Sequence, residues 1–184
     1  MNMFRDEFFK FNKIISLNAF ENHFEKIELV FYALLGFFVP FFFGHPQILI
    51  GTIVNSMLVS AALYSRGYKL IPLALTPSLG VLASGMLFGN LTVFLVYLIP
   101  FIWIGNFLII YGMKFFYLHA KVNYWISSVI SSIVKAGFIF GSALVLVSFG
   151  IIPAALLVPM GLLQVETALA GCAVVFGVHK IRTR

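Results

Sequence analysis

The sequence predicts an all-α membrane protein with six transmembrane helices and both termini in the cytoplasm. Three observations support this fold class. First, 61% of the 184 residues are hydrophobic and only 10% are charged, whereas soluble domains average about 45–50% apolar and about 25% charged residues. Second, the apolar residues form long uninterrupted runs. Third, the basic residues lie at every second break between these runs. A lipid-embedded helix bundle accounts for all three.

The apolar runs are long enough for membrane helices. Six crossings of about 20 residues each take up about 120 residues and leave only short connections. Helices are favoured over barrel strands, because the runs are continuously apolar and barrel strands alternate lipid-facing with lumen-facing residues. We expect the six helices over residues 27–43, 47–64, 70–88, 91–113, 124–149 and 153–178.

Gly, Pro and polar residues mark the breaks between these segments. The first segment ends at Gly-His-Pro (residues 44–46), and the second ends at Ser-Arg-Gly (residues 65–67). The third ends at Gly-Asn (residues 89–90), and the fourth ends before Lys114. A short connection at residues 150–152 separates the fifth from the sixth, so these two helices are expected to be antiparallel neighbours.

The basic residues predict the orientation of the bundle. Eleven of the twelve Lys and Arg residues precede the first segment or follow the second, fourth and sixth, and the other connections contain none. Cytoplasmic loops are enriched in basic residues, so this pattern predicts cytoplasmic ends. We expect a cytoplasmic or interfacial segment over residues 1–25 and a transmembrane domain over residues 26–180. The first of these is Phe-rich and charged, as is typical of either an interfacial helix or a solvated tail.

Several other classes of protein are disfavoured. The net charge of +6 is not gathered on a soluble fold that could bind nucleic acid. A single cysteine, Cys172, cannot form an intramolecular disulfide, and no His/Cys cluster indicates a metal site. Catalytic motifs such as HExxH, the P-loop and GxSxG are missing from the sequence. We therefore expect neither enzymatic activity nor a cofactor.

The twelfth basic residue, Lys135, lies near the middle of the fifth segment. A lysine at this depth costs a few kcal/mol, so it needs a partner or a function. At about 100° per residue it shares one helix face with Ser128, Ser131 and Ser142. This polar face predicts either a lock between helices or a ligand site in the bundle interior.

The sequence leaves the partner of Lys135 open. Glu166, the one acidic residue deep inside a segment, is expected at nearly the same depth. Gln164, however, points to nearly the opposite side of the sixth helix, together with Thr167 and Gly171. Because only one face can meet Lys135, its partner is Glu166, Gln164 or the ligand itself.

Other polar residues add candidates. Thr92, Trp103 and Asn106 lie within about 60° of one another on the fourth helix, which suits a flat, partly polar ligand or simple helix packing. Asn55 is interpreted as an interhelical hydrogen bond. Pairs of small residues four apart predict close helix contacts at Ser56/Ser60, Gly85/Gly89 and Gly137/Gly141.

Four stretches of the chain resemble the substrate-binding S components of energy-coupling factor (ECF) transporters. They are Leu-Thr-Pro-Ser-Leu-Gly-Val-Leu-Ala-Ser-Gly (75–85), Ile-Pro-Phe-Ile-Trp-Ile-Gly-Asn (99–106), Ser-Ile-Val-Lys-Ala (132–136) and Gln-Val-Glu-Thr-Ala-Leu-Ala-Gly (164–171). The resemblance covers residues 27–178. One departure is the small-residue pair common in the first helix of the family, because Ala33 is followed four residues later by Phe37.

The resemblance implies a multi-pass subunit of a prokaryotic cell membrane that captures a vitamin or related micronutrient. Its expected partners are a transmembrane coupling protein and two cytoplasmic ATPase subunits. The family holds its ligand in the outer half of the bundle, among the fourth to sixth helices and the outward loops. The resemblance implies that the substrate-binding residues here include His45, Asn90, Thr92, Trp103, Lys135, Gln164 and Glu166. The polar face of the fourth helix adds Asn106 to this set.

Two other functions remain open at this point. The chain could be a self-sufficient carrier or channel with Lys135 and Glu166 in an ion path, or a membrane anchor subunit of a larger complex. The substrate is open as well. If the intramembrane charges bind the ligand, a heterocycle with a carboxylate is expected. If Lys135 is instead paired within the protein, an uncharged ligand fits equally well.

Overall fold

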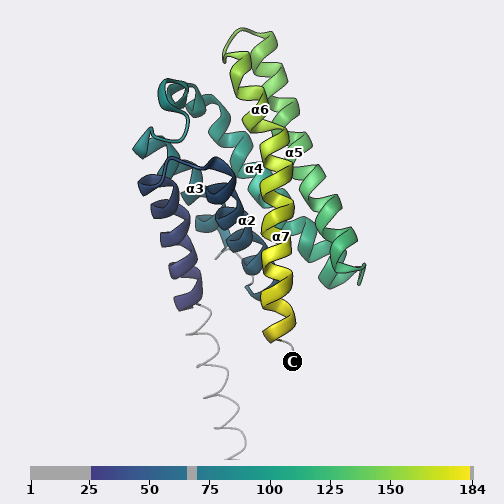
Figure 1. Cartoon of the computed structure of the whole chain (residues 1–184). Helices are drawn as coiled ribbons and strands as arrows, with labels where there is room; N and C mark the ends of the chain where they lie inside the picture. Colours follow the sequence, from purple (N-terminus) through teal and green to yellow (C-terminus); the bar gives the residue numbers. More distant parts are fainter. Residues whose placement is uncertain (1–25, 66–69, 183–184) are drawn as a thin grey trace, which may run out of the picture.

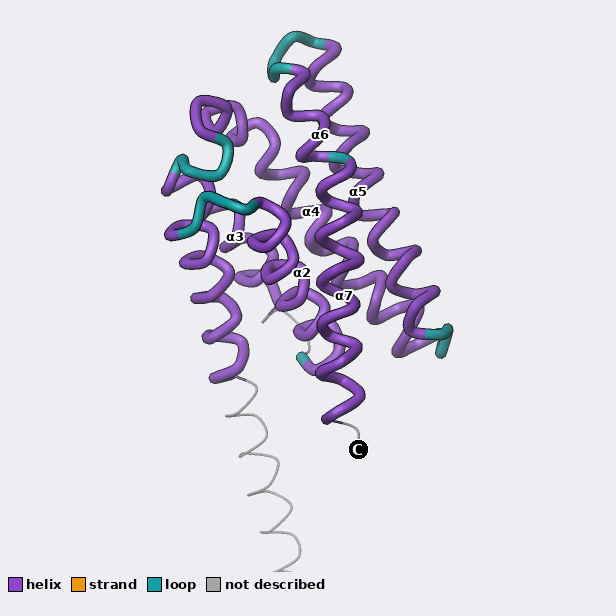
Figure 2. The backbone as a smooth tube through the Cα atoms, viewed as in Figure 1, coloured by secondary structure: helices purple, strands orange, loops and turns teal. Residues whose placement is uncertain are grey.

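The computed structural model describes residues 26–65 and 70–182, and all regular structure in these ranges is helical (Figures 1 and 2). The first described helix covers residues 26–42. It is followed by α2 (Gln47–Tyr64), α3 (Ile71–Ser84), a 3-10 helix (Gly89–Phe94), α4 (Leu95–Met113) and a π-helical turn (Lys114–His119). The chain continues with α5 (Tyr124–Ser148), a 3-10 turn (Ala154–Leu156), α6 (Leu157–Met160) and α7 (Leu162–Arg182). The predicted interfacial segment, residues 1–25, lies outside the described residues.

Within the described ranges, four helical stretches are long and apolar enough to cross a membrane: Gln47–Tyr64, Gly89–His119, Tyr124–Ser148 and Ala154–Ile181. They coincide with the second, fourth, fifth and sixth predicted segments. Many large apolar side chains on their outer surfaces are exposed, as lipid-facing residues are. The all-α class and four membrane-type helices are therefore confirmed. Six crossings stay a prediction, because α3 has only 14 residues and the helix over residues 26–42 is not among the four. The cytoplasmic location of the termini stays a prediction as well.

Two departures from the predicted boundaries have a clear backbone cause. The third segment is predicted to run to residue 88, but α3 ends at Gly85, which adopts a left-handed conformation with φ 69°. Glycine is common at this position because it has no Cβ to clash. The sixth segment is broken at Gly161, with φ −110° and ψ −90°, two residues after Pro159. Proline lacks the N–H that would continue the hydrogen-bond ladder.

Close packing joins α2 to α7 and α4 to α5, the two most extensive helix contacts. A Cβ on Gly51 of α2 would lie 2.6 Å from Thr167 Cγ2, and a Cβ on Gly171 of α7 would lie 2.8 Å from Asn55 Cβ. A Cβ on Gly105 of α4 would meet a side chain of α5 at 2.5 Å. Glycine therefore sets the distance between these helices.

These contacts do not occur at the glycine pairs singled out by the sequence pattern. Positions Gly137 and Gly141 have no atom within 4 Å of an added Cβ. Gly85 and Gly89 adopt positive φ angles at the turns, again with no atom in reach. The spacing pattern found small residues but could not tell which of them meet another helix.

The helices run between two ends of the bundle (Figure 1). We call the end with the connections after residues 42, 84 and 148 the loop end, and the end with the C-terminus and residues 120–123 the terminal end. At the terminal end, His179 of α7 shares hydrogen bonds with the hydroxyls of Tyr64 (2.8 Å) and Tyr117 (3.0 Å). The buried apolar side chains form two clusters, one toward each end.

Candidate functional site

A layer of polar side chains lies between the two hydrophobic clusters. On α2, Asn55 lies between Ile50 of the loop-end cluster and Leu58 of the terminal-end cluster. The corresponding positions on α4, α5 and α7 are held by Asn106, Lys135 and Thr167. The exposed fraction of each polar member is 4% or less. Each of four helices thus contributes one buried polar residue at a similar level of the bundle.

Hydrogen bonds connect three members of this layer. Lys135 Nζ donates to Asn55 Oδ1 over 2.5 Å. The amide nitrogen of Asn55 donates to Thr167 Oγ1 (3.1 Å) and to the carbonyl of Gly51 (2.9 Å). Thr167 Oγ1 in turn donates to the carbonyl of Leu163 (2.7 Å). Both contacts of the Asn55 amide nitrogen are to hydrogen-bond acceptors, so the amide oxygen is the atom that faces the ammonium group of Lys135. Asn55 thereby links α2 to α5 and α7.

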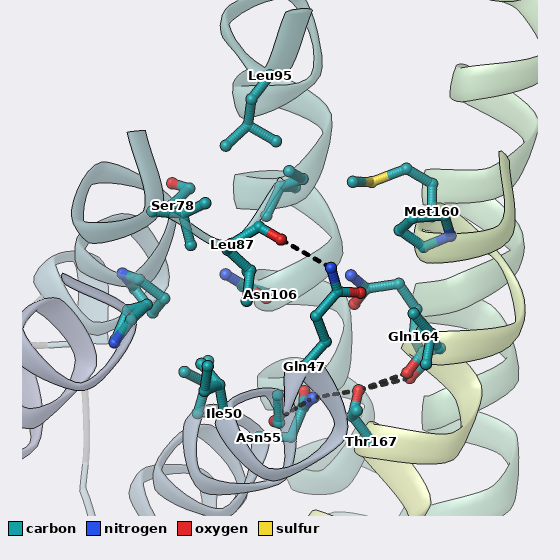
Figure 3. Close-up of a pocket in the computed structure, with 18 of the residues that line it drawn as sticks. Gln47, Ile50, Asn55, Ser78, Leu87, Leu95, Asn106, Met160, Gln164 and Thr167 are labelled. Carbon is teal, nitrogen blue, oxygen red and sulfur yellow. Dashed lines mark hydrogen bonds between the residues drawn. The ribbon is translucent and has the colours of Figure 1, made fainter. Parts of the chain in front are cut away.

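A cavity of about 110 Å³ lies on the loop-end side of the polar layer (Figure 3). Its walls come from the helix over residues 26–42, from α2 to α7, and from Leu87 and Phe88. At the loop end, Gln47 Nε2 donates to the carbonyl of Leu87 over 2.8 Å. A single water needs about 10–15 Å³ and benzene fits a cavity of about 150 Å³, so the space holds several waters or an organic group somewhat smaller than benzene.

The chemistry of the cavity is that of a small-molecule site. Most of its lining is apolar, with a few polar groups that converge from different helices, as in ligand pockets generally. Figure 3 shows the amide side chains of Gln47, Asn106 and Gln164 around the same space. Lys135 is the one charged side chain among the residues that line it.

Three of the predicted substrate-binding residues line this cavity: Lys135, Asn106 and Gln164. Asn106 is oriented by its Nδ2, which donates to the carbonyl of Ala74 in α3 over 2.8 Å. Gln164 lies in the first turn of α7, after the break at Gly161, and is half-buried. That these residues bind a substrate stays a prediction.

Glu166 does not belong to the cavity, which corrects one expectation from the sequence. Its side chain is exposed and is not part of the lining. It follows Gln164 by two residues, so it points about 200° away around α7. The face of α7 that meets Lys135 is therefore the one with Gln164 and Thr167, and the protein partner of Lys135 is Asn55 of α2.

Trp103 and Thr92 are also displaced from their expected role. The indole nitrogen of Trp103 donates to Ser78 Oγ over 2.7 Å, and Ser78, not the indole, lines the cavity. Trp103 thus supports the wall from behind instead of stacking on a ligand. Thr92 is buried and donates to the carbonyl of Gly85 over 3.1 Å, which holds the 3-10 helix against the end of α3.

The two predicted loop residues lie outside the cavity as well. His45 is exposed in the connection before α2, and Asn90 is exposed in the first turn of the 3-10 helix. Neither side chain is part of the lining. The loop-end residue that does reach the cavity is Gln47, because it lies in the first turn of α2 and its side chain bonds to Leu87.

The structure adds four residues to the site that were not predicted from the sequence: Gln47, Asn55, Ser78 and Thr167. The predicted interhelical bond of Asn55 is confirmed by its contact with Thr167. A useful signal was available, because Asn55 falls in the middle of the second segment as Lys135 does in the fifth. Their equal depth in the bundle could have predicted a contact between Asn55 and Lys135. Nothing comparable marks Ser78 or Gln47.

No group of three or more His, Cys, Asp or Glu side chains that could hold a metal ion occurs within the described part of the chain. Comparison of the chain with family models, with curated proteins and with solved structures gave no significant match. The function is therefore inferred from the geometry and chemistry of the cavity.

Proposed function

We propose that the chain is the membrane-embedded, substrate-capturing subunit of an ATP-driven importer of a vitamin or related small molecule, without catalytic activity of its own. The observation that carries this proposal is a cavity that borders the buried ammonium group of Lys135. An intramembrane lysine is costly and commonly marks a functional site. Here it is combined with room for a ligand, which a purely structural lysine does not require.

The expected orientation adds support to this role. The predicted cytoplasmic side corresponds to the terminal end, so the cavity lies in the predicted outer half, where an importer meets its substrate. The sequence has no nucleotide-binding motif. Energy therefore comes from other subunits, which we propose to be a transmembrane coupling protein and two cytoplasmic ATPases.

One observation favours a second candidate, a membrane anchor subunit of a larger complex. The hydrogen bonds from Lys135 to Asn55 and on to Thr167 fix three helices against one another, and an anchor needs nothing more. A carrier with Lys135 and Glu166 in one ion path has no such support, because Glu166 is exposed and lies off the cavity.

The test is an analysis of the small molecules bound to the purified protein, combined with transport measurements. We expect mass spectrometry to detect a bound metabolite in the wild type and not in Lys135→Ala, with equal membrane insertion of both. Proteoliposomes with this chain alone should not accumulate that metabolite, and uptake by cells should require ATP. A protein that co-purifies with a large complex but never with a metabolite would contradict substrate capture and favour the anchor.

A further inference from the structure

Among the described residues, no acidic side chain lines the cavity beside Lys135. A lysine ammonium group has three N–H donors. Within the ranges that the structure describes, Nζ forms one hydrogen bond, to Asn55 Oδ1. The side chain is only 2% exposed and borders the cavity. The cavity is therefore where the remaining hydrogen bonds of Lys135 can be made.

The carboxylates that the structure describes lie elsewhere. Glu166 is on the exposed face of α7, and Glu28, toward the terminal end of the first described helix, accepts a hydrogen bond from Tyr32. The partner that Lys135 does have, Asn55, is neutral. A buried charge without a counter-charge is strongly unfavourable. An anion in this cavity would therefore bind with a more favourable free energy than a neutral molecule of the same shape.

The break between α6 and α7 adds to the same preference. Leu163 and Gln164, in the first turn of α7, both line the cavity. The N-terminus of a helix carries a partial positive charge. In membrane transporters, interrupted helices commonly direct such an end at an anionic substrate group. Lys135 and the start of α7 thus contribute potential of the same sign.

We propose that the ligand of this cavity is a small organic carboxylate, whose charged group bonds to Lys135 Nζ while its apolar or aromatic part contacts the apolar walls. This inference rests on the proposed function, since it names the class of substrate for the same site. One lysine balances one negative charge, which favours a monoanion over a phosphate with nearly two charges at neutral pH. The amides of Asn106 and Gln164 are placed to select among carboxylates.

The test compares acids with their uncharged analogues on the purified full-length protein in detergent. The probes are straight-chain and aromatic monocarboxylates, from acetate to octanoate and benzoate, each with its primary amide of nearly the same shape. We expect at least one acid to raise the unfolding temperature, with an affinity about thirtyfold or more above that of its amide. Equal effects of acid and amide, or no effect of any acid, would overturn the inference.

Two variants separate charge from folding. Lys135→Met removes the cation, and Asn55→Asp places an internal carboxylate beside it with almost no change in side-chain volume. We expect both to lose the preference for acids, the second because the introduced carboxylate neutralises Lys135 from within the protein. Unfolding of the ligand-free variants is the control for correct folding. An acid-specific response that persists in a folded Lys135→Met protein would contradict the proposal.

The outcomes for ligand class and for function can be distinguished. If acids bind through Lys135 but cells without the chain take them up normally, the ligand class holds and the importer role fails. If uptake depends on the chain but the bound metabolite is uncharged, the importer role holds and the ligand class fails.

Discussion

At the scale of single residues, Lys135 shows how a bundle keeps a cation in its interior. Its ammonium group donates to Asn55 Oδ1, and Asn55 is held in place by Thr167 and Gly51. The lysine therefore depends on a neutral amide that two other groups orient. Removing the amide leaves a buried charge without a protein partner, which is worse than removing both groups together.

A double-mutant cycle tests this dependence. We expect Asn55→Leu to lower the free energy of unfolding by about 3–5 kcal/mol, because it leaves the buried ammonium unpaired. Lys135→Met in the same protein should restore a large part of that loss, since no charge then remains. Chemical unfolding of the wild type, both single variants and the double variant in one detergent gives the interaction energy. Strictly additive effects would show that the contact contributes nothing.

At the scale of helices, two glycines bring α2 and α7 together and so place Asn55 beside Thr167. A Cβ on Gly171 would lie 2.8 Å from both Asn55 Cβ and the backbone nitrogen of Ser56, so α2 would have to move. The same helix offers a matched position, Gly177, with no atom within 4 Å of an added Cβ. Both glycines have helical backbones, so the two substitutions differ mainly in this contact.

We expect Gly171→Ala to lower the free energy of unfolding by about 1–3 kcal/mol, the usual cost of overpacking. It should also weaken ligand binding, because the oxygen of Asn55 is displaced from Lys135. Gly177→Ala should be neutral or slightly stabilising, since alanine is the better helix former. Thermal unfolding of both variants decides the matter, and equal loss of stability in the two would refute the close contact.

The sequence predicted most helix boundaries because hydrophobicity and turn residues are local properties. The range of α2 was predicted to the residue, and α5 within one. The early end of α3 at Gly85 and the break at Gly161 depend on backbone conformations that composition does not specify. Helix positions alone could not decide between Glu166 and Gln164, because the rotation of α7 is set by its packing against α2.

The site was predicted less completely than the fold. Lys135, Asn106 and Gln164 were singled out because charged and amide side chains are conspicuous in apolar segments, and all three line the cavity. Trp103 was misplaced because its indole bonds to Ser78 of another helix, a contact invisible in the sequence. Gln47 was missed because it reaches the cavity only through the fold of the loop end.

At the scale of the whole molecule, the prediction to test is six crossings with the loop end outside. The free and buried Cys172 is first replaced by alanine. Single cysteines are then introduced at His45 and Ser148 near the loop end and at Ala120 near the terminal end, all of which are exposed. We expect a membrane-impermeant maleimide to label the first two in intact cells and Ala120→Cys only after permeabilisation. Labelling of all three in intact cells would rule out this topology.

The polar layer, the close helix contacts and the position of the cavity in the bundle all bear on one proposed function, the capture of a substrate at Lys135. The most direct measurement of that function is the depletion of small molecules from a defined medium by cells of the native host. Cells with the wild-type chain should remove at least one organic anion that cells with Lys135→Met, at equal membrane abundance, leave behind. Identical depletion profiles for the two strains would contradict the capture of a substrate at Lys135.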